Sequence, residues 1–371
     1  MKKIAIITLY DDINIGNKLQ NYAVQTFFKD FGFLCTTIPH WEMARDTPTL
    51  LRIKRFIVKV IGLPANKARE LRLLTERKKK FKLFSNQYLH LGNCLRINNI
   101  PREYSKEYDY FVVGSDQVWH NWTQTEEEVN YFFLTFAEFN QRVTISPSFG
   151  KEQVEKQFLD TYKRGLNGFE FLTCREVQGA KIIEETTGKK AHVLLDPTML
   201  IKEKYWFSIE KKPKYIIPTN YLFVYALGKK NEHIYDKIDY LAKKYALSII
   251  DITDVMNREL YLTTPDEFIY LIHNAKLVIT DSFHACVFSI LYRTNFLVFE
   301  RALEDMGDMS SRMETLLSKF KLKNRKIDHC DESCILNTDF SHVEFVLDIE
   351  RSIAIKLYAD YFKKYEGYIG R

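Results

Sequence analysis

The sequence predicts an α/β protein made of two doubly wound, Rossmann-like domains that face each other across a cleft. Short apolar runs that fit buried strands alternate with longer segments whose apolar residues recur at helical spacing. This alternation occurs twice along the chain. A stretch rich in lysine, proline and aromatic residues, from Lys202 to Pro218, separates the two sets. We therefore divide the chain into residues 1–210 and residues 211–371.

The size and composition of the chain indicate a folded, globular protein. At 371 residues it exceeds the usual length of one domain, and its 46% hydrophobic content excludes a disordered chain. The net charge of +6 is too small to indicate nucleic acid, and we expect no such partner. Scattered cysteines, no signal-peptide cleavage site and no apolar run of bilayer length predict a cytoplasmic protein.

The first set of elements opens with a βαβ unit. Lys3 to Leu9 fits a strand, Lys18 to Phe31 a helix that Gly32 ends, and Phe33 to Ile38 a second strand. Helical, basic sequence fills residues 49–88. Further strands are expected at residues 110–113, 142–146, 169–174 and 192–195, and helices at residues 153–165 and 175–187.

The second set repeats the pattern and ends in a long helix. Strands are expected at residues 222–227, 247–251, 276–280 and 296–299, and helices at residues 231–245, 265–274 and 284–292. The terminal helix, residues 342–365, is assigned to the second domain.

Basic residues gather between Arg52 and Lys82, where twelve lysines and arginines face only two acidic residues, Glu70 and Glu76. Apolar residues from Leu50 to Ile61 recur beside them at helical spacing. One interpretation is an ordinary helix whose apolar stripe faces the core and whose lysines are solvated. The other is an amphipathic helix lying on an anionic membrane surface, which would place the protein at the inner face of the plasma membrane.

The loop after the first strand carries amide side chains and one glycine. Asn14, Asn17 and Gln20 lie at the start of the following helix, and Gly16 allows a ligand to approach the backbone closely. This combination suits a sugar or a phosphate, although a capped turn explains Gly16 and Asn17 alone. The GxGxxG pattern of dinucleotide sites is absent, which disfavours NAD.

A second polar cluster follows the strand at residues 110–113. It contains Ser115, Asp116 and Gln117, with Trp119 two residues further on. Such a strand end is the usual place for a ligand. Asp116 could accept a proton from a hydroxyl, and Trp119 could stack on a sugar ring. The competing role for Asp116 is that of a helix N-cap.

Histidine and arginine residues complete the candidate site. Ser282 and His284 stand between an apolar strand and an apolar helix, whose amino end favours an anion. Arg175 follows the strand at residues 169–174, and Arg301 and Arg312 come shortly after His284. Together they suit a pocket for carboxylate or phosphate groups. The competing interpretations are a satisfied histidine beside a capping serine, and a helix-capping ion pair.

These motifs together resemble those of the polysaccharide pyruvyl transferase family, in the order that the family has them. The chain shows the family motifs NIGNKLQNYA from Asn14, VGSDQVW from Val113, SPSFG from Ser146, RE at Arg175, DPT at Asp196 and TDSFH from Thr280. Ala285 stands where family members commonly have glycine. The resemblance implies a two-domain fold similar to GT-B glycosyltransferases and transfer of pyruvate from phosphoenolpyruvate to a sugar as a cyclic ketal.

The chemistry of this reaction suggests roles for the residues above. We expect His284 to act as the acid and Asp116 as the base, with Arg175, Arg301 and Arg312 holding phosphoenolpyruvate. The chemistry requires no metal or cofactor, and the acceptor is a sugar, free or lipid-linked. Two alternatives stay open: a GT-B-type glycosyltransferase that uses a nucleotide-sugar, and a catalytically silent sugar-binding or scaffold protein.

Overall fold

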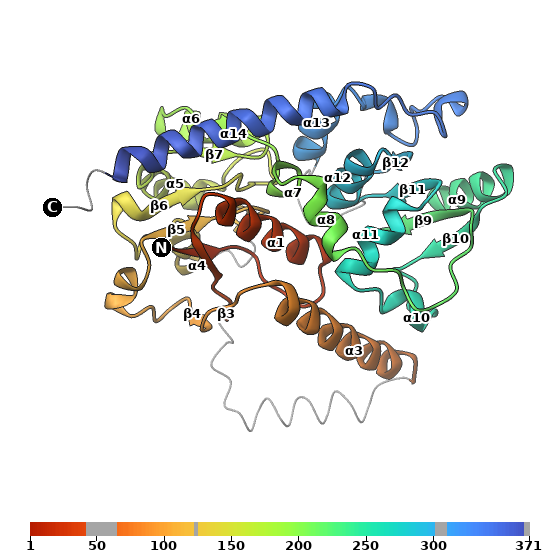
Figure 1. Ribbon diagram of the computed structural model, residues 1–371, viewed down its shortest axis with the longest axis horizontal. Coiled ribbons are helices and arrows are strands. Elements are labelled where there is room, and N and C mark those ends of the chain that lie inside the picture. Colours follow the sequence, from red (N-terminus) through yellow and green to blue (C-terminus); the bar gives the residue numbers. More distant parts are fainter. Residues whose placement is uncertain (42–64, 122–124, 301–309, 367–371) are drawn as a thin grey trace.

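The computed structural model describes residues 1–41, 65–121, 125–300 and 310–366, and every structural statement below concerns these residues. They form two α/β domains, each built on a four-stranded parallel sheet with helices packed around it (Figure 1). The predicted fold class is confirmed.

The first sheet has the strand order β2-β1-β5-β6, and all of its strands run parallel. Residues Ile4 to Ile7 of β1 (Lys3–Ile7) pair with all of β5 (Tyr110–Val113), and both stretches are buried. A sheet covered on both faces needs continuous apolar strands, which is the pattern that the sequence has. The other elements of this part of the chain are β2 (Leu34–Thr37), β3 (His40–Trp41), β4 (Leu95–Arg96), β6 (Arg142–Thr144), β7 (Thr173–Cys174), β8 (His192–Val193), α1 (Ile15–Asp30), α3 (Ala65–Tyr88), α4 (Glu126–Phe132), α5 (Leu159–Asn167), α6 (Val177–Thr187), α7 (Pro197–Leu200) and α8 (Glu203–Ile209).

The second sheet has the order β10-β9-β11-β12 and is also parallel. In both sheets the first strand in sequence lies between the second and the third, so each sheet has a topological switch point beside its first strand. Ligands bind such sheets at the carboxyl ends of the strands at this point. The elements are β9 (Tyr221–Tyr225), β10 (Ser248–Asp251), β11 (Leu277–Thr280), β12 (Phe296–Val298), α9 (Glu232–Lys244), α10 (Arg258–Tyr261), α11 (Pro265–His273), α12 (Phe283–Tyr292), α13 (Ser310–Lys319) and α14 (Val343–Glu366).

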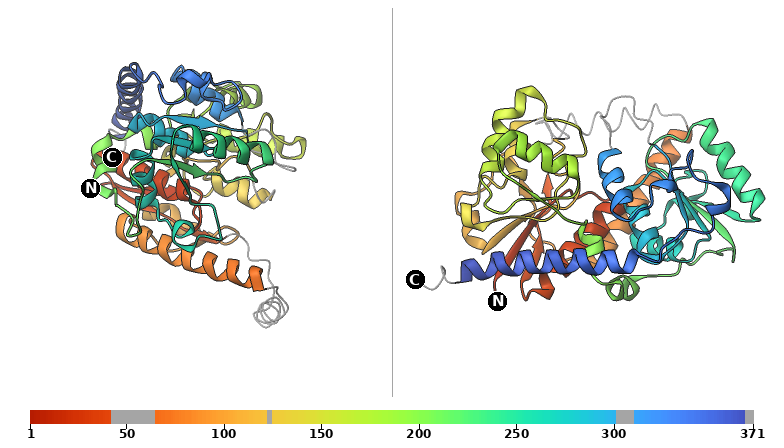
Figure 2. Two further views of the ribbon diagram at one scale, coloured as in Figure 1. Left: turned by 90° about the vertical axis from the view of Figure 1, so that its right-hand side faces the viewer. Right: turned by 90° about the horizontal axis from the view of Figure 1, so that it is seen from above.

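The terminal helix α14 runs past both domains and ends over the first sheet (Figures 1 and 2). Arg351 donates a hydrogen bond to the carbonyl oxygen of Met199 at 2.8 Å, and the Tyr358 hydroxyl donates to the carbonyl oxygen of Thr144 at 2.7 Å. The helix that we assigned to the second domain therefore packs on the first along its later half. The division at residue 210 stays a prediction.

Helix α3 reaches across to the second domain. Arg77 donates to the carbonyl oxygen of Tyr261, and Lys80 donates to that of Leu262 at 3.2 Å. The last carbonyl groups of a helix lack internal partners and attract cations, so these two basic side chains stabilise the end of α10. The apolar stripe from Leu50 to Ile61 lies outside the described residues, and membrane contact through this segment stays a prediction.

Some elements are shorter than their apolar runs predicted. The strand expected over residues 169–174 consists only of Thr173–Cys174, although Phe169 and Leu172 are buried in the core. The helix expected from residue 153 begins at Leu159, after a short 3-10 turn. An apolar run signals burial, and burial does not require strand pairing. None of the helices in the described ranges combines the length and the hydrophobicity that a membrane span needs.

Candidate active site at the domain boundary

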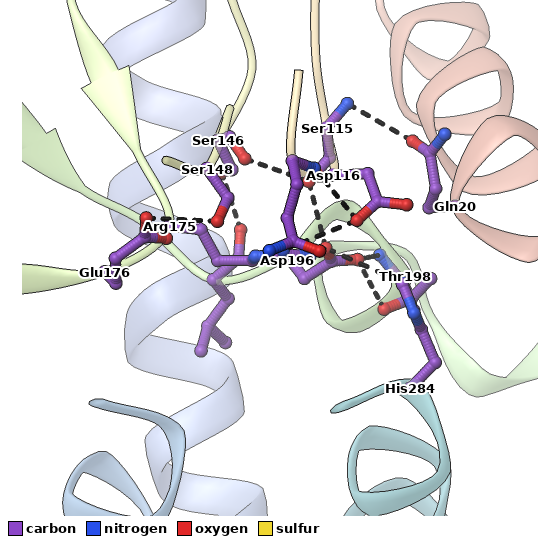
Figure 3. A network of polar contacts seen from close by, with 12 residues as sticks. Gln20, Ser115, Asp116, Ser146, Ser148, Arg175, Glu176, Asp196, Thr198 and His284 are labelled. Carbon is purple, nitrogen blue, oxygen red and sulfur yellow. Dashed lines mark hydrogen bonds and ion pairs between the residues drawn. The ribbon is translucent and has the colours of Figure 1, made fainter. Parts of the chain in front are cut away.

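The loops after the strands of the first sheet meet the first turn of α12, which carries His284, at the boundary between the domains (Figure 3). After β11, Asp281 accepts hydrogen bonds from the backbone N–H groups of Leu227 and Gly228, the loop that follows β9, at 2.7 Å each. These bonds tie the two loops of the second switch point together. Helix α12 then starts, and its first turn presents His284 to the first domain.

The carboxylate of Asp196, which follows β8, is the centre of the site. Its Oδ2 accepts hydrogen bonds from Arg175 Nη1 at 2.8 Å and from Ser115 Oγ at 2.9 Å. Its Oδ1 accepts from the backbone N–H of Thr198 at 3.0 Å and from the Thr198 hydroxyl at 2.6 Å. Burial alone would raise the pKa of Asp196, but Arg175, His284 and Thr198 together lower it to about 2. Asp196 is therefore ionised at neutral pH.

Asp116 lies on another edge of the same guanidinium. Its Oδ1 is 3.6 Å from Arg175 Nη2 and accepts a hydrogen bond from the Gln117 N–H at 2.9 Å. Its Oδ2 accepts from the side-chain amide of Asn17 on α1. The backbone of Asp116 is left-handed, with φ at 67°, a conformation that few non-glycine residues adopt. The loop after β5 thus turns sharply and delivers a carboxylate whose orientation α1 fixes.

Arg175 is only 3% exposed and uses few of its donors. Its Cζ lies 4.3 Å from the centre of the Phe283 ring, and Arg312 Cζ lies 5.7 Å from the same centre. Within the part of the chain that the structure describes, Nε and Nη2 of Arg175 have no hydrogen-bond partner. Burial acts to lower the pKa of Arg175, but the carboxylates around it, Asp196 and Asp116 foremost, raise it overall. A buried, permanently charged guanidinium with spare donors is suited to bind an anion.

His284 is enclosed between the two domains and is 7% exposed. Its Nδ1 faces Gly16 on α1, where a Cβ atom would lie 2.9 Å from ring atoms Cγ and Cε1 and still closer to Nδ1. Its Nε2 lies 3.9 Å from Asp196 Oδ2, which is too far for a hydrogen bond. Gly16 therefore makes room for the imidazole, whereas the sequence suggested room for a ligand.

The charge of His284 depends on opposing influences. Burial lowers its pKa, and the nearby guanidinium groups of Arg175 and Arg312 act in the same direction. The carboxylates of Asp196 and Asp116 oppose this shift without cancelling it. The imidazole is therefore mainly neutral at pH 7 in the free protein, and an added anion would favour its protonation.

Two residues that we predicted to contact substrate instead support the site. Gln20 and Ser115 are fully buried. Gln20 accepts a hydrogen bond from the backbone N–H of Ser115 at 3.2 Å and donates to the Thr8 hydroxyl at 2.9 Å, and the Ser115 hydroxyl is hydrogen-bonded to Asp196. Their role is thus to fix the loop after β5 against α1.

The predicted stacking of Trp119 on a sugar is wrong. Its side chain is 1% exposed, its indole N–H donates to the carbonyl oxygen of Phe132 at 3.2 Å, and its ring packs against Phe149. Ser282 is also buried, and it caps α12 by accepting a hydrogen bond from the backbone N–H of Ala285 at 3.5 Å. Trp119 belongs to the core of the first domain, and Ser282 to the framework that aims His284.

The remaining predicted residues have structural contacts that leave substrate binding untested. Asn14 caps α1 by accepting a hydrogen bond from the backbone N–H of Asn17 at 3.4 Å. The Gln117 amide packs over Gly150, which has no room for a side chain. Arg301 lies outside the described residues. For all of these, a role in binding substrate stays a prediction.

The sequence profile of the family described as polysaccharide pyruvyl transferase matches residues 14–302, from the cap of α1 to beyond His284. The chain belongs to the polysaccharide pyruvyl transferase family. Among curated proteins, General stress protein 30 of Bacillus subtilis (strain 168) is 24% identical over 202 residues. The matched region is 50% of this chain and 55% of that protein, so the chain spans about half the length of the curated relative that it matches.

Solved structures share the fold of this pyruvyl transferase family member. A protein named as a UDP-N-acetylglucosamine 2-epimerase, from Listeria monocytogenes, has a TM-score of 0.53 at 10% identity, covering 98% of this chain and 97% of that one. The UDP-GlcNAc 2-epimerase of Neisseria meningitidis bound to UDP-GlcNAc has a TM-score of 0.47 at 11% identity, covering 98% and 100%. The likeness to the Listeria monocytogenes protein shows the GT-B-like fold alone.

Three residues of this site appeared in the sequence only as parts of family motifs, without a predicted role. Asp196 and Thr198 were visible as an Asp-Pro-Thr motif after an apolar strand, which signals a carboxylate fixed at a strand end. Glu176 Oε1 accepts hydrogen bonds from the Ser148 hydroxyl and from the backbone N–H groups of Phe149 and Gly150, at 3.0, 2.8 and 3.2 Å. It holds the loop after β6. In the described ranges no three His, Cys, Asp or Glu side chains cluster as metal ligands.

Proposed function

We propose that this family member transfers pyruvate from phosphoenolpyruvate to two hydroxyl groups of a sugar, forming a cyclic ketal and releasing phosphate. The observation that carries the proposal is the convergence of Arg175 and His284. Within the described residues, the guanidinium Nε and Nη2 and the imidazole Nε2 are buried without hydrogen-bond partners. Buried donors without partners cost free energy, and a bound anion would supply the acceptors.

Phosphoenolpyruvate needs two anion-binding positions, because it carries a carboxylate and a phosphate. Arg175 and Arg312 approach the same ring, that of Phe283, from different elements. The amino end of α12 lies beside them and adds its dipole, and Arg301 follows in the sequence. These groups support the binding of a small dianion or trianion better than that of a neutral sugar alone.

The bond changes balance without an oxidant, a reductant or a metal. Protonation of the methylene carbon makes C2 electrophilic, and one sugar hydroxyl adds to C2 and gives up its proton. A second hydroxyl then displaces phosphate from C2. The C=C π bond, the C–O bond to phosphate and two O–H bonds of the sugar are broken. One C–H bond, two C–O bonds to the sugar and one O–H bond on phosphate are formed, because the proton of the second hydroxyl leaves with the phosphate. The phosphate departs with its bridging oxygen, and we therefore expect no cofactor.

Two side chains suit the proton transfers. His284 is the proposed acid: its pKa is lowered in the free protein by burial, and the charges of phosphoenolpyruvate would raise it again. The same imidazole could protonate the departing phosphate or serve as an anion ligand. Asp116 is the proposed base for the first hydroxyl, because its carboxylate lies at the same strand ends as Arg175.

The proposed acceptor is a sugar of a surface polysaccharide or of its lipid-linked precursor. The family name supports a polysaccharide substrate, and the basic segment from Arg52 to Lys82 would favour the lipid-linked form if it binds membrane. In that case the reaction takes place in the cytoplasm at the inner face of the plasma membrane.

Isothermal titration of the full chain with phosphoenolpyruvate and, separately, with UDP-N-acetylglucosamine tests the donor. We expect phosphoenolpyruvate to bind and Arg175→Gln to weaken binding about tenfold or more, because a charge-assisted hydrogen bond contributes about 1.5–3 kcal/mol. Arg164→Gln is the matched control, since Arg164 is exposed and pairs with Glu126. Binding of the nucleotide-sugar alone, lost in Arg175→Gln, would instead favour the glycosyltransferase alternative.

A further inference from the structure

We infer that Asp196 is the positioning residue of the site: its single carboxylate orients Arg175 and faces the imidazole of His284, whose protonated form it favours. The inference rests on the proposed function, because it explains how that function's anion-binding group and proton donor are kept ready. Asp196 itself, with only 1% of its side chain and backbone exposed, is not placed to touch substrate.

The two carboxylate oxygen atoms of Asp196 have different roles: Oδ1 is anchored by Thr198, and Oδ2 faces Arg175 and His284. Oδ1 is held by the N–H and the hydroxyl of Thr198, which fixes the plane of the carboxylate. Oδ2 points between Arg175 Nη1, at 2.8 Å, and His284 Nε2, at 3.9 Å (Figure 3). The anchor is local and rigid because Thr198 lies in the helical turn that Asp196 caps.

Contact with Asp196 determines which donors Arg175 offers. A guanidinium has five N–H donors in a fixed fork. Nη1 is bound to Asp196, so Nε and Nη2 remain for a ligand on the other edges. The ring of Phe283, 4.3 Å from Cζ, covers one face of the group. Without Asp196 the guanidinium could rotate toward Asp116, which lies 3.6 Å from Nη2.

The negative charge of Asp196 raises the pKa of His284, whereas burial lowers it. The charged groups that face the imidazole are Asp196, Asp116, Arg175 and Arg312. The two arginines and burial favour the neutral form, and the two carboxylates favour the protonated form, Asp196 more than Asp116. Since Asp196 Oδ2 lies 3.9 Å from His284 Nε2, Asp196 is the carboxylate whose removal should change the imidazole most.

Histidine NMR of the full chain measures this effect without any turnover. We compare wild type, Asp196→Asn and Glu176→Gln, and we assign His284 among the nine histidines by the signal lost in His284→Asn. Loss of the negative charge should lower the titration midpoint of His284 by about one pH unit or more in Asp196→Asn. Glu176→Gln, which removes another fully buried carboxylate of the same sheet edge, should leave the midpoint unchanged.

The kinetic consequence is a fall in kcat/KM for phosphoenolpyruvate in Asp196→Asn. We expect about tenfold to a hundredfold, by analogy with residues that orient the ligands of metal sites. The pH profile should move to lower pH together with the NMR midpoint. If Asp196→Asn does not fold, Thr198→Val tests the same anchor: kcat/KM should fall, and Thr198→Ser should restore it.

Two results would overturn the inference. One is a His284 midpoint in Asp196→Asn equal to that of wild type, and the other is a Thr198→Val protein with unchanged kcat/KM. Absence of pyruvyl transfer in wild type, with the NMR shift intact, would count against the proposed function and leave the coupling of Asp196 to His284 standing.

Discussion

Gly16 and His284 lie in different domains and touch at the centre of the site. The glycine is buried in the first turn of α1, and the imidazole occupies the space where its Cβ would be. A side chain at residue 16 would therefore push His284 away from Asp196 or separate α1 from α12. The requirement for glycine here comes from packing between the domains.

Gly16→Ala should accordingly reduce activity more than stability. The added methyl group cannot coexist with the imidazole as placed, and a misplacement of about 1 Å can cost about a hundredfold in rate. We expect kcat/KM to fall by that order while the unfolding midpoint in urea changes little. The control is Gly32→Ala, at a glycine with a positive φ where an added Cβ would meet no heavy atom within 4 Å, so that strain should lower stability without affecting kcat/KM. Unchanged kcat/KM in Gly16→Ala would contradict the contact.

Membership of the candidate site could be predicted from the sequence where a polar motif directly follows a predicted strand. His284, Asp116 and Arg175 come together as the strand ends suggested. Trp119 could not be placed, because a tryptophan near a strand end is equally suited to stacking on a sugar and to filling a core. The role of Asp196, which the sequence offered only as part of a family motif, could not be predicted, because its partners Ser115 and Arg175 are 81 and 21 residues away in sequence. Only folding brings them to one oxygen atom.

Helix α3 carries basic residues in two settings. Arg77 and Lys80 hold the end of α10, and their charges are engaged within the protein. Lys78, Lys79 and Lys82 are exposed on the same helix. A lysine close to an anionic membrane contributes about 1 kcal/mol, and such contributions fall off within about 10 Å at 0.1 M salt.

Flotation with vesicles that contain anionic lipid tests this helix. We expect the full chain to float at low salt and to stay in solution at high salt. Replacing Lys78, Lys79 and Lys82 together by glutamine should weaken flotation. The control replaces three exposed lysines of the second domain, Lys229, Lys243 and Lys276, with an equal loss of charge. Failure of the wild-type chain to bind at low salt would leave the ordinary-helix interpretation.

Helices and strands were predictable where the periodic apolar pattern extends over many residues, and less so where it covers only a few. Residues 231–245 were expected as a helix, and α9 covers Glu232–Lys244. The strand expected at residues 169–174 shrank to two residues, because β7 pairs only with the equally short β8. The path of α14 was not predictable, since its packing on the first sheet depends on Tyr358 and Arg351 finding partners far away in sequence.

The two domains share one hydrophobic core, which fixes the site between them. Phe28 and Leu19 of the first domain belong to the same buried cluster as Phe268 and Phe288 of the second. Trp206 contacts both domains: the centre of its ring lies 4.8 Å from the ring centre of Phe288 and 5.4 Å from that of Tyr22. The sequence predicted two domains and the site between them. It could not predict this shared core, because which helices pack across a boundary is decided by complementary shape.

The central claim is that this molecule moves pyruvate from phosphoenolpyruvate to a sugar with cleavage of the C–O bond. The most direct measurement uses phosphoenolpyruvate labelled with ¹⁸O in its bridging oxygen, the full chain, and the methyl glycosides of galactose, glucose, mannose and N-acetylglucosamine as acceptors. We expect a glycoside heavier by one pyruvate less one water, with an equal amount of phosphate that carries the label. Label found in free pyruvate, or a sugar product that forms only when a nucleotide-sugar is supplied, would contradict the account.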